Sequence, residues 1–281
     1  MRILDTSIIK ENVEALLLKA NYNIGERTFN ILKKSYETET RPVSKFVLDQ
    51  IIKNDEIALN ENIPMCQDTG MAVIFLELGQ EVYLTGESLY DAVNDGVREA
   101  YESGYLRKSV VCDPVFDRVN TKDNTPAIIH TDIVPGSQVK ITVAPKGFGS
   151  ENMSAIKMLK PSDGVEGVKD FVIDTVKKAG PNPCPPIIVG IGLGGTFEKC
   201  AYLAKKSLTR ELGEHNTSER YSNLEKQLLE KINTLNIGPA GLGGKTTALA
   251  VHIDYFPTHI AGMPVAVNIC CHAYRHSSIT I

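Results

Sequence analysis

The sequence predicts a mixed α/β fold of the α+β class, in which a helical N-terminal layer packs with mixed β-sheets. Three observations lead to this class. Apolar residues recur at helical spacing through about residues 1–62, runs of strand length begin at residue 71, and no repeat or low-complexity linker interrupts the chain. We therefore expect one large domain over residues 1–281, a length that one large domain or two small ones can fill.

The first half of the chain predicts helices followed by strands. The residues that form two apolar helical faces are Ile8, Ile9, Val13, Leu16, Leu17, Phe46, Val47, Ile51 and Ile52. A β-branched apolar run over residues 71–78 predicts a strand, and the apolar positions of residues 89–100 predict a helix that ends near Gly104. Residues 127–134 and 138–144 predict extended segments, the second because its apolar residues alternate.

The second half predicts further helices and apolar strand-like runs. In order, we expect an amphipathic helix, a strand-turn-helix unit, a charged helix and two apolar runs: residues 164–178, 186–208, 216–231, 247–253 and 265–271. The dipeptide Gly180-Pro181 supplies a stop signal after the first helix, because proline cannot continue one.

Composition excludes several classes of protein. The formal charge of −4 and the pI near 5.9 give no electrostatic basis for binding nucleic acid or an anionic membrane. No apolar run approaches the roughly 18–20 residues that span a bilayer. The N-terminus turns acidic and polar at once, so it lacks the apolar region of a signal peptide. We expect a cytoplasmic protein.

The six cysteines are Cys66, Cys112, Cys184, Cys200, Cys270 and Cys271. They are too sparse for a disulfide scaffold, and a cytoplasmic chain keeps them reduced. No Cys-x-x-Cys pair occurs, which removes the simplest zinc, ferredoxin and thioredoxin interpretations. Cys112 and Cys200 have the character of structural thiols, the second because it falls among apolar residues of a predicted helix.

Two of the remaining cysteines lie in motifs suited to chemistry. In Cys66-Gln67-Asp68-Thr69-Gly70, a thiolate can ligate iron while the neighbouring carboxylate moves a proton; a polar turn with a buried thiol is the alternative. Cys184 is bracketed by three prolines, which stiffen the backbone as a metal ligand requires. The alternative for Cys184 is a proline-rich connector that happens to contain a cysteine.

Two glycine-rich stretches suggest a different class, a nucleotide-binding protein. Residues 190–195 satisfy Gly-x-Gly-x-x-Gly between a predicted strand and helix. However, this stretch does not open a βαβ unit, and no strand ends in an acidic residue about 20 positions later. Residues 238–247 resemble a phosphate loop, but Pro239 removes a backbone N–H where the motif needs glycine.

Together these motifs resemble class I fumarases. The matching stretches are residues 66–70, 106–109, 120–127, 146–152, 184–186, 190–199, 236–239 and 257–275. They recur in this order over roughly residues 40–275, and the ordered set is far more specific than any member. The resemblance also covers L(+)-tartrate dehydratases, which share these α-subunit motifs. It implies a hydro-lyase, with reversible hydration of fumarate to L-malate, a step of the tricarboxylic acid cycle, expected ahead of tartrate dehydration.

The resemblance implies a [4Fe–4S] cluster held by three cysteines, with one iron left free to act as a Lewis acid on the substrate. Cys66 and Cys184 match the family pattern directly. For the third ligand, the family pattern is an asparagine, a cysteine three positions later and an arginine four positions after that. Asn268, Cys271 and Arg275 match it, so the resemblance implies Cys271, with Cys270 as the alternative.

The resemblance further implies roles for residues around the cluster. Asp68 is the expected acid–base residue, and His259 is expected to orient or polarise the substrate. The expected contacts to the substrate carboxylates come from Gln67, Arg107 and the backbone near Gly149.

Single-chain relatives carry a further C-terminal domain, whereas this sequence stops at Ile281. We therefore expect the α half of an enzyme completed by a β subunit, as an α2β2 assembly acting on a small dicarboxylate. Two other classes stay open: a nucleotide-binding protein that uses residues 190–195, and a binding or regulatory protein whose cysteines are only structural.

Overall fold

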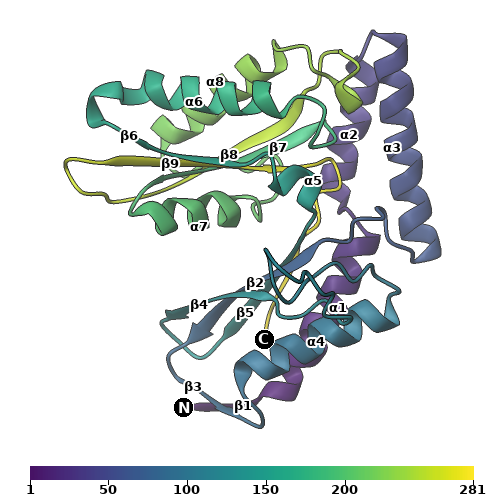
Figure 1. The fold of residues 1–281 in the computed structure, drawn as a ribbon, viewed down its shortest axis with the longest axis vertical. Coiled ribbons are helices and arrows are strands. Elements are labelled where there is room, and N and C mark those ends of the chain that lie inside the picture. The colour runs from purple at the N-terminus through teal and green to yellow at the C-terminus, as the bar shows by residue number, and fades with distance from the viewer. The chain divides into compact units, whose positions relative to one another are not determined.

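The computed structural model describes every residue from Met1 to Ile281. Contacts within the chain group it into two compact units. Unit 1 comprises Met1–Ile24, Asp55–Phe148 and Arg275–Ile281, and unit 2 comprises Gly25–Asn54 and Gly149–Tyr274. Each unit combines a β-sheet with packed helices (Figure 1), so the predicted mixed α and β class is confirmed. That residues 1–281 act as one domain stays a prediction.

Unit 1 is built on a sheet with the strand order β10-β5-β2-β4 and on a separate parallel pair of β1 and β3. Strand β2 pairs in parallel with β4 and antiparallel with β5, which pairs antiparallel with β10. The elements are β1 (Arg2–Asp5), α1 (Thr6–Tyr22), β2 (Met71–Gly79), β3 (Val82–Thr85), α4 (Leu89–Ser103), β4 (Ile128–Val134), β5 (Val139–Lys146) and β10 (Ser277–Thr280).

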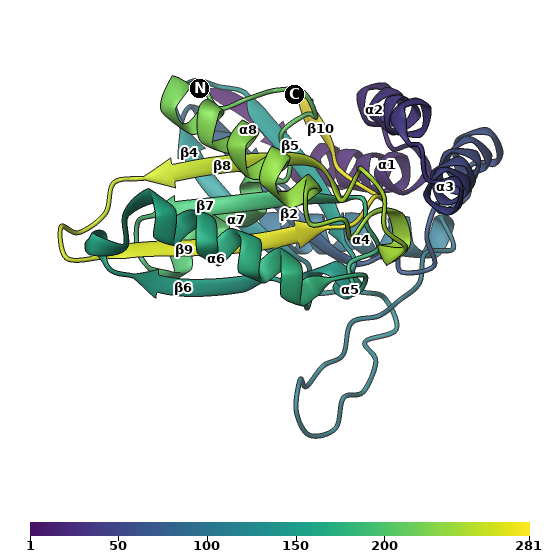
Figure 2. The ribbon, with the colours of Figure 1, turned by 90° about the horizontal axis from the view of Figure 1, so that it is seen from above.

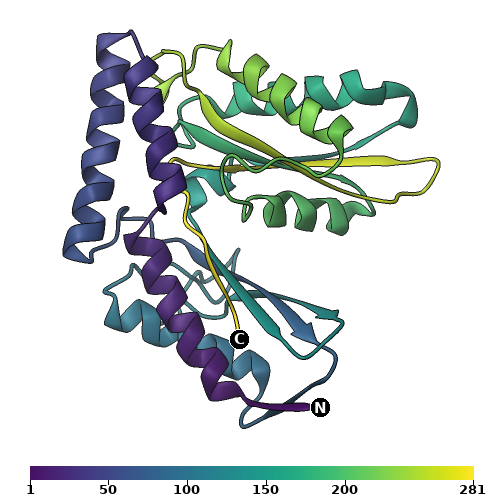
Figure 3. The ribbon, with the colours of Figure 1, turned by 180° about the vertical axis from the view of Figure 1, so that it is seen from behind.

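The core of unit 1 forms where α1 packs on α4 and on β5 (Figures 1 and 3). Asp5 begins α1, because its side chain accepts a hydrogen bond from the N–H of Ser7 at 3.0 Å. Gly96 lets the two helices approach closely, since a Cβ there would lie 2.5 Å from the carbonyl oxygen of Lys10. A long loop over residues 104–127 joins α4 to β4 (Figure 2).

Unit 2 is a four-stranded sheet of order β6-β9-β7-β8, with β7 and β8 parallel and β9 antiparallel to both β7 and β6. Helices α6 and α8 cover one face of this sheet and α7 covers the other (Figure 1). The elements are α2 (Glu26–Thr38), β6 (Ala155–Leu159), α6 (Gly164–Ala179), β7 (Ile187–Gly194), α7 (Phe197–Ser207), α8 (Glu219–Asn233), β8 (Ala248–Phe256) and β9 (Met263–Cys270). Two helices run across the unit boundaries, α3 (Pro42–Glu61) and the short α5 (Phe148–Glu151).

The predicted helices and strands are present in the structure. The strand predicted at residues 71–78 is β2, and the helix predicted at 164–178 is α6. The sequence did not predict the short strands β1, β3, β6 and β10. They span four or five residues each, too few for a period to stand out, and their distant partners stabilise them. No helix combines the length and apolarity that crossing a membrane requires.

Candidate active site

The loop between α3 and β2 carries Cys66 and is anchored on both sides. Before the cysteine, the buried Met65 donates its N–H to the carbonyl oxygen of Asn21 at 3.0 Å. After it, the hydroxyl of Thr69 donates to the carbonyl oxygen of Arg107 at 3.1 Å. Cys66 is half-buried and Gln67 is exposed. The loop therefore has a defined path while both side chains stay accessible, and the backbone of Arg107 lies beside it.

Asp68 is held by two backbone hydrogen bonds from opposite sides. Its Oδ1 accepts from the N–H of Gly70 at 3.1 Å, and its Oδ2 accepts from the N–H of Phe148 at 2.8 Å. Gly70 has a φ of +81°, and a Cβ there would lie 2.6 Å from the backbone of Lys146, so only glycine fits. The carboxylate is thereby fixed where the start of β2 meets the end of β5.

Buried polar groups surround Asp68. Arg275 is 4% exposed and donates from Nη1 to Oδ1 of Asn21 at 3.1 Å. The hydroxyl of Tyr101 donates to the carbonyl oxygen of Gly70 at 2.8 Å. Burial raises the pKa of this hydroxyl, the positive Arg275 lowers that pKa and the negative Asp68 raises it, so Tyr101 stays a neutral donor. The resemblance did not assign a role to Asn21 or Tyr101, and no motif marks either.

The loops of Cys184 and Cys271 meet in unit 2. Cys184 precedes β7, and Cys271 is the first residue after β9. The N–H of His272 points to the carbonyl oxygen of Cys184 at 3.4 Å, so the two loops lie side by side. Cys184 is exposed with a φ of +51°, and Cys271 is half-buried. Neither cysteine forms a disulfide, and the prolines on both sides of Cys184 restrict its backbone, which suits a metal ligand.

The other cysteines differ in setting. Cys270 is the last residue of β9, where it pairs with Ile188 and is 8% exposed. Cys200 is fully buried on α7, and burial raises the pKa of its thiol. Cys112 is exposed in the loop of residues 104–127. Within either unit, no three histidine, cysteine or acidic side chains form a metal-binding group.

Within unit 2, His259 lies apart from Cys184 and Cys271. His259 is exposed in the hairpin between β8 and β9, and its Nδ1 accepts from the N–H of Ala261 at 3.2 Å. Cys184 and Cys271 lie at the other end of the same sheet, about 25 Å away along the eight residues of β9. Gly149 follows Phe148 in α5 and is exposed.

The structure gives the glycines of residues 190–195 a packing role. Gly190 and Gly192 lie in β7 under α7. A Cβ on Gly190 would lie 2.2 Å from the carbonyl oxygen of Ala204, and one on Gly192 would lie 1.9 Å from that of Cys200. These glycines let the helix approach the strand. In the second glycine-rich stretch, a Cβ on Gly244 would lie 2.6 Å from Oε2 of Glu39, which places that loop against the turn between α2 and α3.

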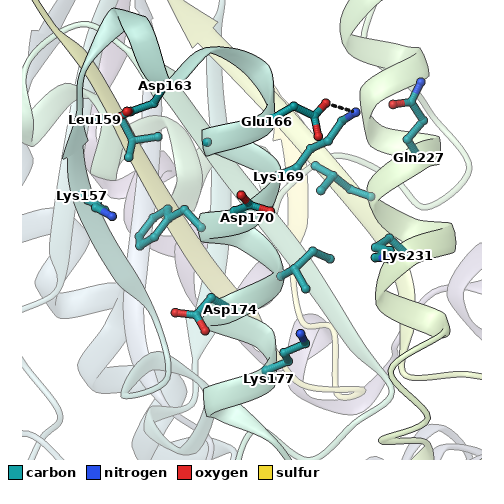
Figure 4. Close-up of a pocket in the computed structure, with 14 residues that line it drawn as sticks. Lys157, Leu159, Asp163, Glu166, Lys169, Asp170, Asp174, Lys177, Gln227 and Lys231 are labelled. Carbon is teal, nitrogen blue, oxygen red and sulfur yellow. Dashed lines mark hydrogen bonds and ion pairs between the residues drawn. The ribbon is translucent and has the colours of Figure 1, made fainter.

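A cavity of about 1000 Å³ lies elsewhere in unit 2, between β6, α6 and α8 (Figure 4). Four lysines and four acidic residues line it, and Glu166 pairs there with Lys169 at 2.8 Å. The charges balance, so the cavity offers a dicarboxylate no net attraction. None of the candidate site residues lines it.

Comparison with known proteins adds a family resemblance over nearly the whole chain. A family model described as "Fumarate hydratase (Fumerase)" matches residues 10–280. A Methanocaldococcus jannaschii protein provisionally named L(+)-tartrate dehydratase subunit alpha is 43% identical over 273 residues, or 96% of each chain. The L(+)-tartrate dehydratase subunit alpha of Escherichia coli K12 is 34% identical over 254 residues, covering 89% of this chain and 83% of its own. The subunit of that name from Shigella sonnei gives the same values.

Proposed function

We propose the function of this chain from one premise: it belongs to the fumarate hydratase family, whose model spans nearly all of the sequence. The chain is therefore part of a hydro-lyase, and its relatives carry the name of an α subunit. Our proposal is a cytoplasmic α subunit that hydrates fumarate to L-malate reversibly. A β subunit completes the active site, in an α2β2 assembly.

The proposed cofactor is a [4Fe–4S] cluster on Cys66, Cys184 and Cys271. The residues present fit this group, because none of the three thiols forms a disulfide and none is fully buried. Cys271 is preferred to Cys270, since it has left the strand and lies beside the loop of Cys184. When bound, such a cluster supplies a Lewis acid that assists departure of the substrate hydroxyl.

The observation that carries the proposal is the placement of Cys66 and Asp68 two residues apart on one anchored loop. Each oxygen of Asp68 accepts one backbone hydrogen bond and keeps a second lone pair. The carboxylate is half-buried, so it can reach a bound substrate and take the proton from the carbon next to a substrate carboxylate.

Substrate binding requires positive charge and hydrogen-bond donors, because a dicarboxylate carries two negative charges. We propose that Gln67 and Arg107 contact these carboxylates, as both are exposed next to the Cys66 loop. Gly149 offers its backbone N–H. His259, which the resemblance expects to orient or polarise the substrate, lies about 25 Å from the loops of Cys184 and Cys271, so we do not place it in this substrate site.

L(+)-Tartrate is the second candidate substrate, and the names of the relatives favour it. The test is anaerobic production of the chain with its β subunit, cluster reconstitution, and kcat/KM for L-malate, fumarate and L(+)-tartrate. Faster turnover of malate and fumarate supports our choice, and faster turnover of tartrate replaces it with the second candidate. No turnover of any of the three overturns the proposed reaction.

The role of Asp68 is tested in the same preparation. We expect Asp68→Asn to lower kcat by about a hundredfold or more, with iron content unchanged. Asp91→Asn, an exposed carboxylate on α4, serves as the matched control and should keep full activity. Full activity in Asp68→Asn would show that the acid–base group lies elsewhere.

A further inference from the structure

Arg275 is a buried cation without an ionic partner. The residue is 4% exposed, and its Nη1 donates to the neutral side chain of Asn21 at 3.1 Å. Its Nε has no hydrogen-bond partner, and no carboxylate forms an ion pair with it. Burying a charge in this way is costly unless a nearby anion offsets it. The arrangement therefore points to a function that needs positive charge at this position.

The carboxylate of Asp68 lies near that charge. A Cβ built on Gly147 would lie 3.1 Å from Oδ2 of Asp68 and 3.2 Å from Nη2 of Arg275. The carboxylate and the guanidinium thus flank the same α-carbon, and both act electrostatically on the hydroxyl of Tyr101. Backbone N–H groups already hold both oxygens of Asp68, and the guanidinium adds an electrostatic attraction to them.

Asn21 fixes the position of the guanidinium. It is fully buried in the last turn of α1, and its Nδ2 donates to the carbonyl oxygen of Leu17 at 2.9 Å. Its Oδ1 accepts from Arg275, while its backbone carbonyl accepts from Met65, the residue before Cys66. Through its side chain and its backbone carbonyl, this one buried asparagine therefore contacts the helix, the cation and the start of the loop that carries the proposed acid–base residue.

We propose that Arg275, held by Asn21, is a positioning residue that keeps the Asp68 carboxylate oriented for proton transfer. It acts through Asp68 and does not touch the substrate. The inference rests on the proposed function, because it takes Asp68 as the acid–base residue. A displacement of about 1 Å in such a group can lower turnover by about a hundredfold, so the effect should be measurable.

The test uses the reconstituted α and β complex, with kcat, KM and iron content measured for each variant. Arg275→Ala should lower kcat by about ten- to a hundredfold with KM and iron nearly unchanged. Added guanidinium ion should restore part of this activity, and Arg275→Lys should retain more kcat than the alanine variant. Asn21→Asp supplies a carboxylate that draws the guanidinium away from Asp68, so kcat should also fall. Arg98→Ala, at a surface arginine paired with Asp95 and Asp123, is the matched control and should leave kcat unchanged.

Several outcomes would overturn the inference. One is unchanged kcat in both Arg275→Lys and Asn21→Asp at full iron loading. This result would reject the positioning role of Arg275 even if Arg275→Ala does not fold. Another is a raised KM with kcat unchanged, which would make Arg275 a substrate contact. If the wild type has no hydro-lyase activity, or if Asp68→Asn is fully active, the proposed function fails instead. An active wild type with inactive Asp68→Asn and fully active Arg275 variants removes this inference alone.

Discussion

The backbone N–H of His272 points to the carbonyl oxygen of Cys184 at 3.4 Å and joins the end of β9 to the proline-rich loop before β7. Residues 88 positions apart in the chain thereby bring two cysteine loops together. Cys271 immediately precedes His272, so its backbone is placed by the same contact. The neighbouring Cys270 is still part of the strand and buried. This difference between adjacent cysteines is directly testable.

We expect Cys66→Ala, Cys184→Ala and Cys271→Ala each to lose most of the iron and acid-labile sulfide of the anaerobically reconstituted complex. The wild type should hold about four irons per chain. Cys270→Ala should keep its iron, because this side chain packs inside unit 2. Cys112→Ala, at an exposed thiol, is the control. Iron lost from Cys270→Ala but kept in Cys271→Ala would exchange the two assignments, and an iron-free wild type would remove the cluster altogether.

Gly192→Ala should destabilise the chain by about 3 kcal/mol or more, because the new Cβ would lie 1.9 Å from the carbonyl oxygen of Cys200 and force α7 off the sheet. Thermal or urea unfolding measures this change. Gly262→Ala is the control, since its Cβ would meet no atom closer than 3.9 Å.

NAD and ATP should leave the Tm of the wild type unchanged. A rise in Tm with either nucleotide would instead revive the nucleotide-binding alternative.

Gly147→Ala should lower kcat by about tenfold while changing the free energy of unfolding by only about 1 kcal/mol. The added methyl would press on the side-chain ends of Asp68 and Arg275, at 3.1 and 3.2 Å, rather than on backbone. The two side chains can move without unfolding the chain, but the movement changes the orientation of the Asp68 carboxylate. Steady-state kinetics and urea unfolding of the same preparation separate the two effects. A large loss of stability would assign Gly147 a purely structural role.

Glu39 should make stability depend on pH. Burial raises the pKa of this carboxyl, but hydrogen bonds from the N–H groups of Arg41, Lys245 and Thr40 outweigh burial and hold the pKa below its ordinary 4.5. A carboxyl with a lowered pKa in the folded state contributes its full stabilisation above its ordinary pKa. That contribution is lost as pH falls from the ordinary pKa through the lowered one. We therefore expect the urea midpoint to drop below about pH 4.5.

Glu39→Gln provides the comparison for this pH dependence. The variant should be less stable at pH 7 by about 1–3 kcal/mol, because the charged acceptor is lost, and its midpoint should fall less steeply at low pH. Glu37→Gln, at an exposed position of α2, should behave like the wild type. Equal pH profiles for the wild type and Glu39→Gln would contradict the assignment.

Much of the secondary structure could be predicted because its cause is local. The apolar period that marks α1, α4 and α6 and the β-branched run of β2 are properties of neighbouring residues. The chemistry of the Cys66 loop could be predicted for the same reason. A thiol and a carboxylate two positions apart lie on the same loop wherever the fold places that loop. The strand β1 could not be predicted, because its partner β3 is about 80 residues away.

Other features depended on contacts that no local pattern encodes. The spacing of residues 190–195 is the same whether the glycines approach a phosphate or a helix, and only the position of α7 over β7 distinguishes the two. The hydrogen bond between Asn21 and Arg275 joins residues 254 positions apart.

The sequence by itself determined the types of element, the candidate side chains and, through its ordered motifs, the family. Each of these follows from residue identity and short-range spacing. The tertiary structure alone decided that Cys184 lies beside the Cys271 loop, that His259 lies at the far end of their sheet, and that a buried guanidinium flanks Asp68. Those relationships arise when distant segments bury apolar surface together, and the side chains they carry meet only as a consequence of that packing.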